Sequence, residues 1–291
     1  TDDTLYGVIT LYVEPGHKRT PEEERFLTAV ADTLAGTIRH HRTEAELEKR
    51  RVELVAAGMI QRHLLPSEPP VLPGFEIAGA MFPARFAAGD HYDYLRLPDG
   101  RWAFVVADVS GKGVGPAVLV AAVHARLAAL AESTSDVSDI LARTNARLSA
   151  ESDPGMFVTL FLGCLDPRAR TLVYASAGHP PGFVIGRDGQ LRCTLDSTSL
   201  PLAIDPGARF PAAGPIVLQP GDTMLVLTDG VLEAADPAED FFGSERALET
   251  LRAHRHEPAA EIVDALYRAV SAFTHPDRPQ DDVTAVVIKV L

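Results

Sequence analysis

The sequence predicts an α+β fold built as a sandwich, and two observations support this prediction. Strand-like segments stand in neighbouring pairs joined by short turns, which is typical of antiparallel hairpins. The turns are Pro98-Asp99-Gly100, Asp166-Pro167 and Arg187-Asp188-Gly189. Helix-like segments also come in pairs, at about Val114–Ala131 with Val137–Ala150 and Ser244–Ala253 with Ala259–Phe273. Runs of strands and pairs of helices favour this fold class over alternating β-α-β units.

The size and composition of the chain allow a sizeable core. Its 291 residues are 46% hydrophobic and 23% charged, as in ordinary globular proteins. A core of that size needs no disulfide to hold it together. Cys164 and Cys193 lie in apolar, strand-like surroundings without C-x-x-C spacing. We interpret both as reduced core residues of a cytoplasmic protein.

The charge balance restricts the partners that we expect. A formal net charge of −13, from 40 acidic and 27 basic residues, argues against a nucleic-acid partner, which clustered Lys and Arg would bind. The chain has no run of 18 apolar residues, so we predict no membrane span and interpret the Ala-, Val- and Leu-rich segment 115–130 as a core helix. The first residues lack the pattern of a signal peptide, and we expect the chain to begin inside a domain.

The N-terminal part predicts one strand and one long helix. Leu5–Val13 alternates like a strand and ends at a Glu14-Pro15-Gly16 turn. Thr20-Pro21-Glu22-Glu23 is typical of a helix start, and apolar residues then recur at helical spacing as far as Met59. A helix from about Pro21 to His63 favours a dimeric coiled coil. The alternative is two helices with a charged, solvated face at 43–53.

Prolines divide the chain after this helix. Pro66, Pro69, Pro70 and Pro73 predict a stiff linker, and from Phe75 the pattern changes to strands and hairpins. We therefore expect three parts, which are residues 1–40, a helical linker at 41–70 and a larger domain at 71–291.

Four aspartates beside glycines or at strand ends predict a metal centre. Apolar runs lead into Asp108 and Asp229, and similar settings surround Asp90 and Asp281. Each Asp-Gly pair alone is typical of a turn. Several carboxylates that converged would repel one another unless cations held them together, and a site made of oxygen atoms suits Mg²⁺ or Mn²⁺ better than zinc.

At these residues the chain resembles a known family from about Met59 onward. It is similar to the sporulation stage II E / RsbU-like branch of the type 2C metal-dependent protein phosphatases. The motifs that carry this resemblance are Ile60-Gln61-Arg62 with Leu64-Leu65-Pro66, Ala88-Gly89-Asp90-His91-Tyr92-Asp93, Asp108-Val109-Ser110-Gly111-Lys112-Gly113, Ala177-Gly178-His179-Pro180-Pro181, Leu227-Thr228-Asp229-Gly230-Val231 and Asp281-Asp282-Val283-Thr284. Residues 1–40 resemble, more weakly, the end of a GAF-type sensor domain.

The resemblance implies a four-layer α-β-β-α sandwich and a phosphoserine or phosphothreonine phosphatase with two divalent cations, Mn²⁺ or Mg²⁺. Asp108 would bridge both ions, and the Val109 carbonyl would bind one of them. Asp229 and Asp281 would bind the other, and Asp90 would bind directly or through a water. Asp93 or Asp282 would support these ligands. Water activated between two cations would then attack the phosphoester.

The resemblance also implies a role in bacterial signalling. The expected substrate is a phosphorylated anti-anti-sigma (STAS-type) regulator in a stress response, and an upstream sensor would act through a dimeric linker helix. Two departures from the pattern leave a catalytically weak binding module open as an alternative, because Ala88 replaces a glycine and Ser110 stands where many relatives carry an acid histidine. A binuclear hydrolase of a small phosphate ester is a further alternative. Arg85 is a candidate for phosphate binding, although a solvated role is also open to it and to Lys112.

Overall fold

A computed structural model describes residues 6–8, 10, 12, 15–84, 86–111, 113–151, 153, 155–274 and 281–291. The chain divides into two compact units, Thr1–Glu53 and Leu54–Leu291, and the boundary falls inside helix α1 (Pro21–Leu64). We describe each unit separately.

The long helix predicted from Pro21 to His63 is confirmed as one continuous helix of 44 residues. Its start is a capping box, since the Glu23 N–H donates to Thr20 Oγ1 at 3.2 Å and the Thr20 N–H donates to Glu23 Oε2 at 2.8 Å. The strand predicted over 5–13 falls partly outside the described residues, and those described, 6–8, 10 and 12, are not in a strand. Dimerisation through this helix stays a prediction.

The larger unit contains two five-stranded antiparallel sheets, so the predicted fold class is confirmed. One sheet has the order β1-β10-β9-β6-β7 and the other β2-β3-β4-β5-β8. The strands are β1 (Phe75–Phe82), β2 (Asp90–Arg96), β3 (Trp102–Val109), β4 (Val158–Asp166), β5 (Thr171–Ala177), β6 (Gly182–Ile185), β7 (Leu191–Leu195), β8 (Ala213–Val217), β9 (Thr223–Leu227) and β10 (Val283–Val290). The three predicted hairpins are β2–β3, β4–β5 and β6–β7.

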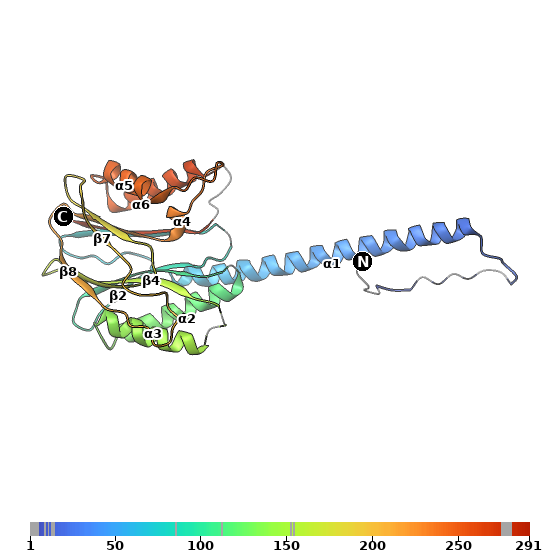
Figure 1. The fold of residues 1–291 in the computed structure, drawn as a ribbon, viewed down its shortest axis with the longest axis horizontal. Coiled ribbons are helices and arrows are strands. Elements are labelled where there is room, and N and C mark those ends of the chain that lie inside the picture. Colours follow the sequence, from blue (N-terminus) through green and yellow to red (C-terminus); the bar gives the residue numbers. More distant parts are fainter. Residues whose placement is uncertain are drawn as a thin grey trace. The chain divides into compact units, whose positions relative to one another are not determined.

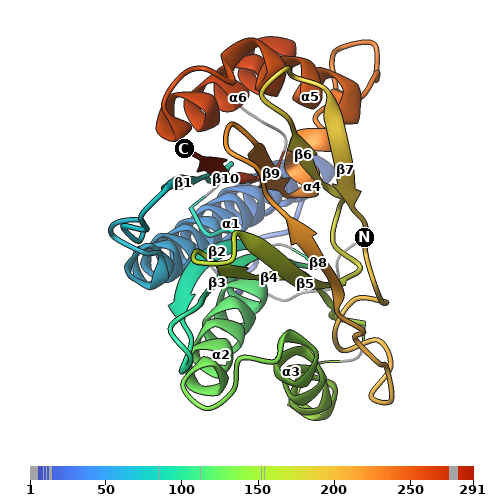
Figure 2. The same cartoon turned by 90° about the vertical axis from the view of Figure 1, so that its left-hand side faces the viewer.

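Helices cover the outer face of each sheet, which completes the four layers. Helices α2 and α3 lie against the β2–β8 sheet, and α5 and α6 cover the other (Figures 1 and 2). The helices of this unit after α1 are α2 (Val114–Ala131), α3 (Val137–Glu151), α4 (Asp229–Leu232), α5 (Gly243–His254) and α6 (Ala259–Phe273).

Strand alternation explains why the central strands are apolar along their whole length. In β3, Phe104 and Val106 enter the core between the sheets, whereas Ala103 and Val105 pack toward the outer helices. β10 divides its residues in the same way between the inter-sheet core and the core beneath α5 and α6. Because both faces are covered, neither strand shows the polar alternation of a half-exposed sheet.

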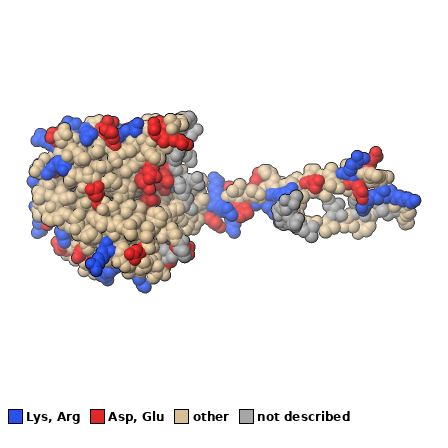
Figure 3. All heavy atoms as spheres, viewed as in Figure 1, with Lys and Arg blue, Asp and Glu red and all other residues tan. Residues whose placement is uncertain are grey.

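Helix α2 is the only described helix long and apolar enough to cross a membrane by length and composition. Here it buries Ala117, Val120, Val123 and Leu127 within the core that joins the β2–β8 sheet to its helices. This packing confirms its interpretation as a core helix. Cys164 and Cys193 are both free thiols. On the face shown in Figure 3, acidic and basic side chains of the larger unit lie interspersed.

Candidate active site

Both sheets deliver carboxylates to the same end of the sandwich. Asp90 is the first residue of β2 and lies opposite Asp108 in the β3 register. Asp229 follows β9 as the first residue of the short helix α4, and Asp281 and Asp282 come directly before β10. Because β9 and β10 are neighbours, the sequence-distant aspartates meet there, as their strand-end positions predicted.

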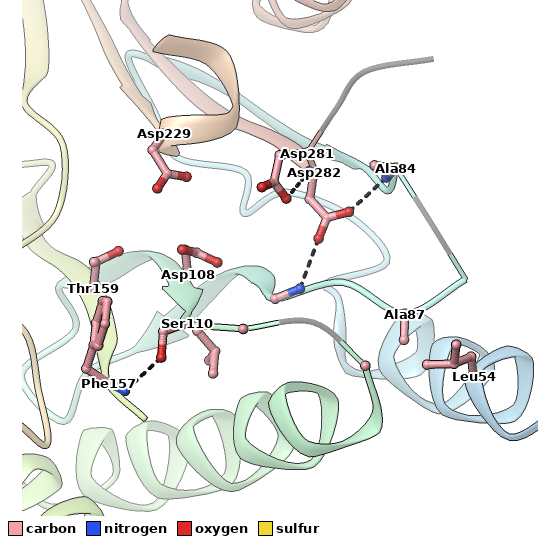
Figure 4. A pocket seen from close by; sticks show the side chains of 14 residues that line it. Leu54, Ala84, Ala87, Asp108, Ser110, Phe157, Thr159, Asp229, Asp281 and Asp282 are labelled. Carbon is pink, nitrogen blue, oxygen red and sulfur yellow. Dashed lines mark hydrogen bonds between the residues drawn. The ribbon is translucent and has the colours of Figure 1, made fainter. Parts of the chain in front are cut away.

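These carboxylates surround a cleft of about 430 Å³. Asp108, Asp229 and Asp281 point toward a common space (Figure 4). Asp282 is the fourth acidic residue of the lining, and the other lining residues are uncharged. The lining residues are Leu54, Ala84, Ala87, Gly89, Asp108, Val109, Ser110, Gly111, Gly113, Phe157, Thr159, Asp229, Asp281 and Asp282.

Asp90 is not among the residues that line the cleft, and it is 3% exposed. Its Oδ2 accepts a hydrogen bond from Thr228 Oγ1 at 2.7 Å. Thr228 is fully buried, and its Oγ1 also accepts from the Thr284 N–H at 3.2 Å. Burial, followed by the charge of Asp108, raises the pKa of Asp90 well above its ordinary value. The Asp90 carboxylate is therefore held in a fixed place by the opposite sheet.

The carboxylates repel one another across the cleft. Burial, followed by the charges of Asp229, Asp281 and Asp282, raises the pKa of Asp108 from 3.8 to about 7. Burial, followed by the charges of Glu233 and Asp281, also raises the pKa of Asp229. The charged side chains among the described lining residues are all carboxylates. An all-oxygen donor set of this kind fits hard divalent cations such as Mg²⁺ or Mn²⁺.

Asp282 differs from Asp281 in what it holds. Its Oδ1 accepts from the Ala84 N–H at 2.8 Å, and its Oδ2 accepts from the Gly89 N–H at 2.9 Å. Both oxygens thus fasten the segment before β2 to the start of β10. Asp281 Oδ1 accepts from the Asp282 N–H at 2.9 Å. This arrangement supports the prediction that Asp281 faces the cations and that Asp282 supports the site.

Gly89 and Gly230 allow two pairs of backbone segments to pack closely at the site, Gly89 against Val109 and Gly230 against Asp282. A Cβ at Gly89 would lie 2.7 Å from the Val109 carbonyl oxygen and 2.8 Å from Asp108 Oδ1. A Cβ at Gly230 would overlap the carbonyl oxygen of Asp282. The glycines beside Asp90 and Asp229 are therefore required by close packing at the carboxylate cluster.

The other predicted site residues are placed as follows. Val109 lines the cleft, and Ser110 Oγ accepts from the Phe157 N–H at 2.9 Å. Asp93 does not line the cleft, since its carboxylate faces His124 of α2. Arg85 and Lys112 lie outside the described residues.

Sequence reasoning missed two residues that position this site. Thr228 carries the hydrogen bond to Asp90. Gln61, near the end of α1, pairs with the backbone of Ala88, just before Gly89. Both residues lie inside motifs that carry the family resemblance. Their polar side chains inside apolar surroundings were the available signal, because a buried amide or hydroxyl needs a partner.

Comparisons with known proteins agree with this geometry. A model of the family described as stage II sporulation protein E (SpoIIE) matches residues 98–291. Protein IcfG of Synechocystis sp. is 29% identical over 265 residues, which are 82% of this chain and 41% of IcfG. Phosphoserine phosphatase RsbU of Bacillus subtilis is 25% identical over 91% of this chain and 78% of its own length.

A solved structure of the RsbU and RsbW domains of Rv1364c from Mycobacterium tuberculosis has the same fold. It superposes with a TM-score of 0.63 and is 27% identical, over 76% of this chain and 62% of that one. The chain thus spans less than half the length of IcfG and under two thirds of the Rv1364c chain.

Proposed function

The chain belongs to the stage II sporulation protein E (SpoIIE) family, and from this premise we propose that it is a metal-dependent phosphatase of phosphoserine or phosphothreonine in proteins. The observation that carries the proposal is the cluster of Asp108, Asp229 and Asp281 around one cleft, with Asp90 buried opposite Asp108 in the β2–β3 pairing. RsbU, a relative over most of its length, is named a phosphoserine phosphatase.

The cluster would hold two cations, Mn²⁺ or Mg²⁺. Asp108 and the Val109 carbonyl, Asp229 and Asp281 would bind them, and Asp90 would bind directly or through a water. Divalent cations bound there would lower the pKa of a water that attacks the phosphorus and would offset the charge of the phosphoryl oxygens.

The remaining residues of the chain would keep these carboxylates in place. Thr228 fixes one oxygen of Asp90 at 2.7 Å. Asp282 ties Ala84 and Gly89 to the start of β10, so that β2 and β10 keep their relative position at the cleft. Ser110 Oγ is engaged with the Phe157 N–H, which supports a structural role for this side chain.

The likeness to RsbU also supports a substrate class and a setting. We propose that the substrate is a phosphorylated STAS-type anti-anti-sigma regulator in a partner-switching system of the cytoplasm. The Rv1364c structure, which carries an RsbU and an RsbW domain, supports such a system.

Regulation would come through a homodimer formed by α1. Large apolar side chains on this helix are exposed, which a second helix could cover. They are Phe26, Leu34, Ile38, Leu47 and Val52.

The test is Mn²⁺-dependent hydrolysis of p-nitrophenyl phosphate and of a phosphoserine-containing STAS protein. We expect both reactions, and a loss of about 100-fold or more in Asp108→Asn and Asp229→Asn. Asp188→Asn is the matched control, because Asp188 is exposed in a turn, where it accepts from the Gln190 N–H. Full activity of either cleft variant would refute the assignment.

The two substrates separate the alternatives. Hydrolysis of the small ester alone would indicate a small-molecule phosphatase. A folded protein that hydrolyses neither substrate would be a binding module.

A further inference from the structure

The strand that begins at Asp90 also presents side chains on its other face. Successive strand residues point to opposite sides, so Tyr92 packs in the core between the sheets while His91 and Asp93 face α2. There they meet His124, which α2 places in edge-to-face contact with His91 at 5.2 Å between ring centroids. Three side chains of the types that bind metal ions, two from β2 and one from α2, therefore converge away from the carboxylate cleft.

These three side chains are close enough to share one ion. One ligand atom from each lies within 4.8 Å of the other two. His124 Nδ1 lies 3.1 Å from Asp93 Oδ2, and Asp93 Oδ1 accepts from the Tyr94 N–H at 2.7 Å. In a tetrahedral zinc site, ligand atoms about 2.0–2.1 Å from the metal are separated by roughly 3.4 Å. Side-chain rotations that move the ligand atoms by about an ångström would therefore bring all three to the spacing of a zinc site.

The cluster also leaves nitrogen atoms unsatisfied. His91 is 2% exposed, and its Nε2 has no hydrogen-bond partner among the described residues. His124 Nδ1 is near the Asp93 carboxylate, but within the described part of the chain it makes no hydrogen bond. A buried polar atom without a partner costs about 1–3 kcal/mol. A bound cation would satisfy these atoms, whereas an ion pair of His124 with Asp93 would leave His91 Nε2 unpaired.

We propose that His91, Asp93 and His124 form a binding site for a transition-metal ion, with Zn²⁺ as the ion that suits it best. Two imidazoles and one carboxylate are typical zinc ligands, and the backbone N–H on Asp93 Oδ1 holds the carboxylate as ligands are commonly held. The fourth position is left for water, and the partly exposed His124 side chain, at 24%, gives an ion access. The all-oxygen cleft prefers a different class of ion.

The site would join α2 to the edge strand β2. Asp90 is the residue before His91, and α2 begins just after the cleft residues Ser110, Gly111 and Gly113. A bound ion would therefore fix both segments that flank the carboxylate cleft, and we expect it to raise the melting temperature.

The test is a titration of the whole chain with Co²⁺ and Zn²⁺ in excess Mg²⁺, which fills the oxygen sites. We expect one equivalent of tightly bound Zn²⁺, and Co²⁺ should give the strong visible bands of tetrahedral coordination. His124→Gln and Asp93→Asn should weaken Zn²⁺ binding about 100-fold or more. His254→Gln is the matched control, since His254 is a partly exposed helical histidine beside Glu257, and it should bind as the wild type does.

The variants separate this site from the proposed phosphatase centre. Asp229→Asn should keep Zn²⁺ binding whether or not the phosphatase assignment is correct. Wild-type protein that binds neither ion in excess Mg²⁺ would overturn the proposal, as would unchanged binding by a folded His124→Gln. Loss of Zn²⁺ binding in Asp229→Asn would place the ion in the carboxylate cleft and would also overturn it.

Discussion

Gln61 provides a test of how the end of α1 supports the cleft. The side chain is 5% exposed, its Nε2 donates to the Ala88 carbonyl at 2.7 Å, and its Oε1 accepts from the Ala88 N–H at 3.0 Å. Ala88 is itself 2% exposed. Beside them, a Cβ at Gly58 would overlap the Phe86 carbonyl oxygen. The helix thus holds the segment that leads into Gly89 and Asp90.

Replacing Gln61 with Leu keeps a similar volume but removes both hydrogen bonds. Two buried backbone groups of Ala88 would then lack partners, at about 1–3 kcal/mol each. We expect a loss of about 2–5 kcal/mol in the free energy of unfolding. Mn²⁺-dependent turnover should fall about 10-fold or more, because the segment before Asp90 is no longer fixed and small displacements of ligands are costly.

Urea unfolding followed by the fluorescence of Trp102, the single tryptophan, measures the stability of this unit. Arg62→Leu is the control, because Arg62 is the exposed neighbour on the same helix, and it should change stability by less than about 0.5 kcal/mol. If Gln61→Leu unfolds at the same urea concentration as the wild type and keeps full turnover, the support attributed to Gln61 is wrong.

Three further predictions concern the cleft itself. Thr228→Val removes the hydroxyl that donates to Asp90 and should raise the Mn²⁺ concentration needed for half-maximal activity about 10-fold. Thr228→Ser keeps a hydroxyl and should need the same Mn²⁺ concentration as the wild type. Equal concentrations for the wild type and both variants would contradict this role of Thr228. Gly230→Ala should lower the free energy of unfolding by about 3 kcal/mol, because the new Cβ overlaps the Asp282 carbonyl; an unchanged melting temperature would rule out that close contact. The third prediction concerns the pKa of Asp108 in metal-free protein. Between pH 3.8 and about 7, the folded state keeps the Asp108 proton, whereas the unfolded chain has lost it. The free energy of unfolding should therefore fall by up to about 1.4 kcal/mol per pH unit as the pH rises through this range. Melting temperatures measured with a chelator should fall as the pH rises from 3.8 to about 7, and added Mg²⁺ should restore the melting temperature at neutral pH. A melting temperature that rises with pH in this range would contradict burial and carboxylate repulsion as the cause of the raised Asp108 pKa.

Local chemistry was enough to predict much of the fold. The Pro98-Asp99-Gly100 turn and the capping box at Thr20 are local signals, and each lies where it was predicted. The order of the strands within each sheet was not predictable in this way. β1 pairs with β10 across some two hundred residues, and such pairings depend on which faces can be buried together.

The site was predictable in part, because some of its signals are also local in the sequence. Apolar runs leading into Asp108 and Asp229 indicated buried strands that end in a carboxylate, and the structure brings these residues together. Either Asp93 or Asp282 was expected to support the metal ligands. Asp282 lines the cleft, whereas Asp93 is three residues from Asp90 in one strand, so its side chain points to the opposite side. Strand parity alone could have separated these two residues of β2, whereas the meeting of His91 with His124 required the packing of α2.

The most direct test of the central claim is the number of Mn²⁺ ions that the cleft binds. Equilibrium dialysis of His124→Gln protein counts the cleft ions alone, since that variant lacks the proposed zinc site. We predict two Mn²⁺ ions per chain, and loss of both from the same protein with Asp108→Asn added while its circular dichroism stays unchanged. Two ions retained after Asp108→Asn, or none bound before it, would show that these carboxylates are not the metal centre.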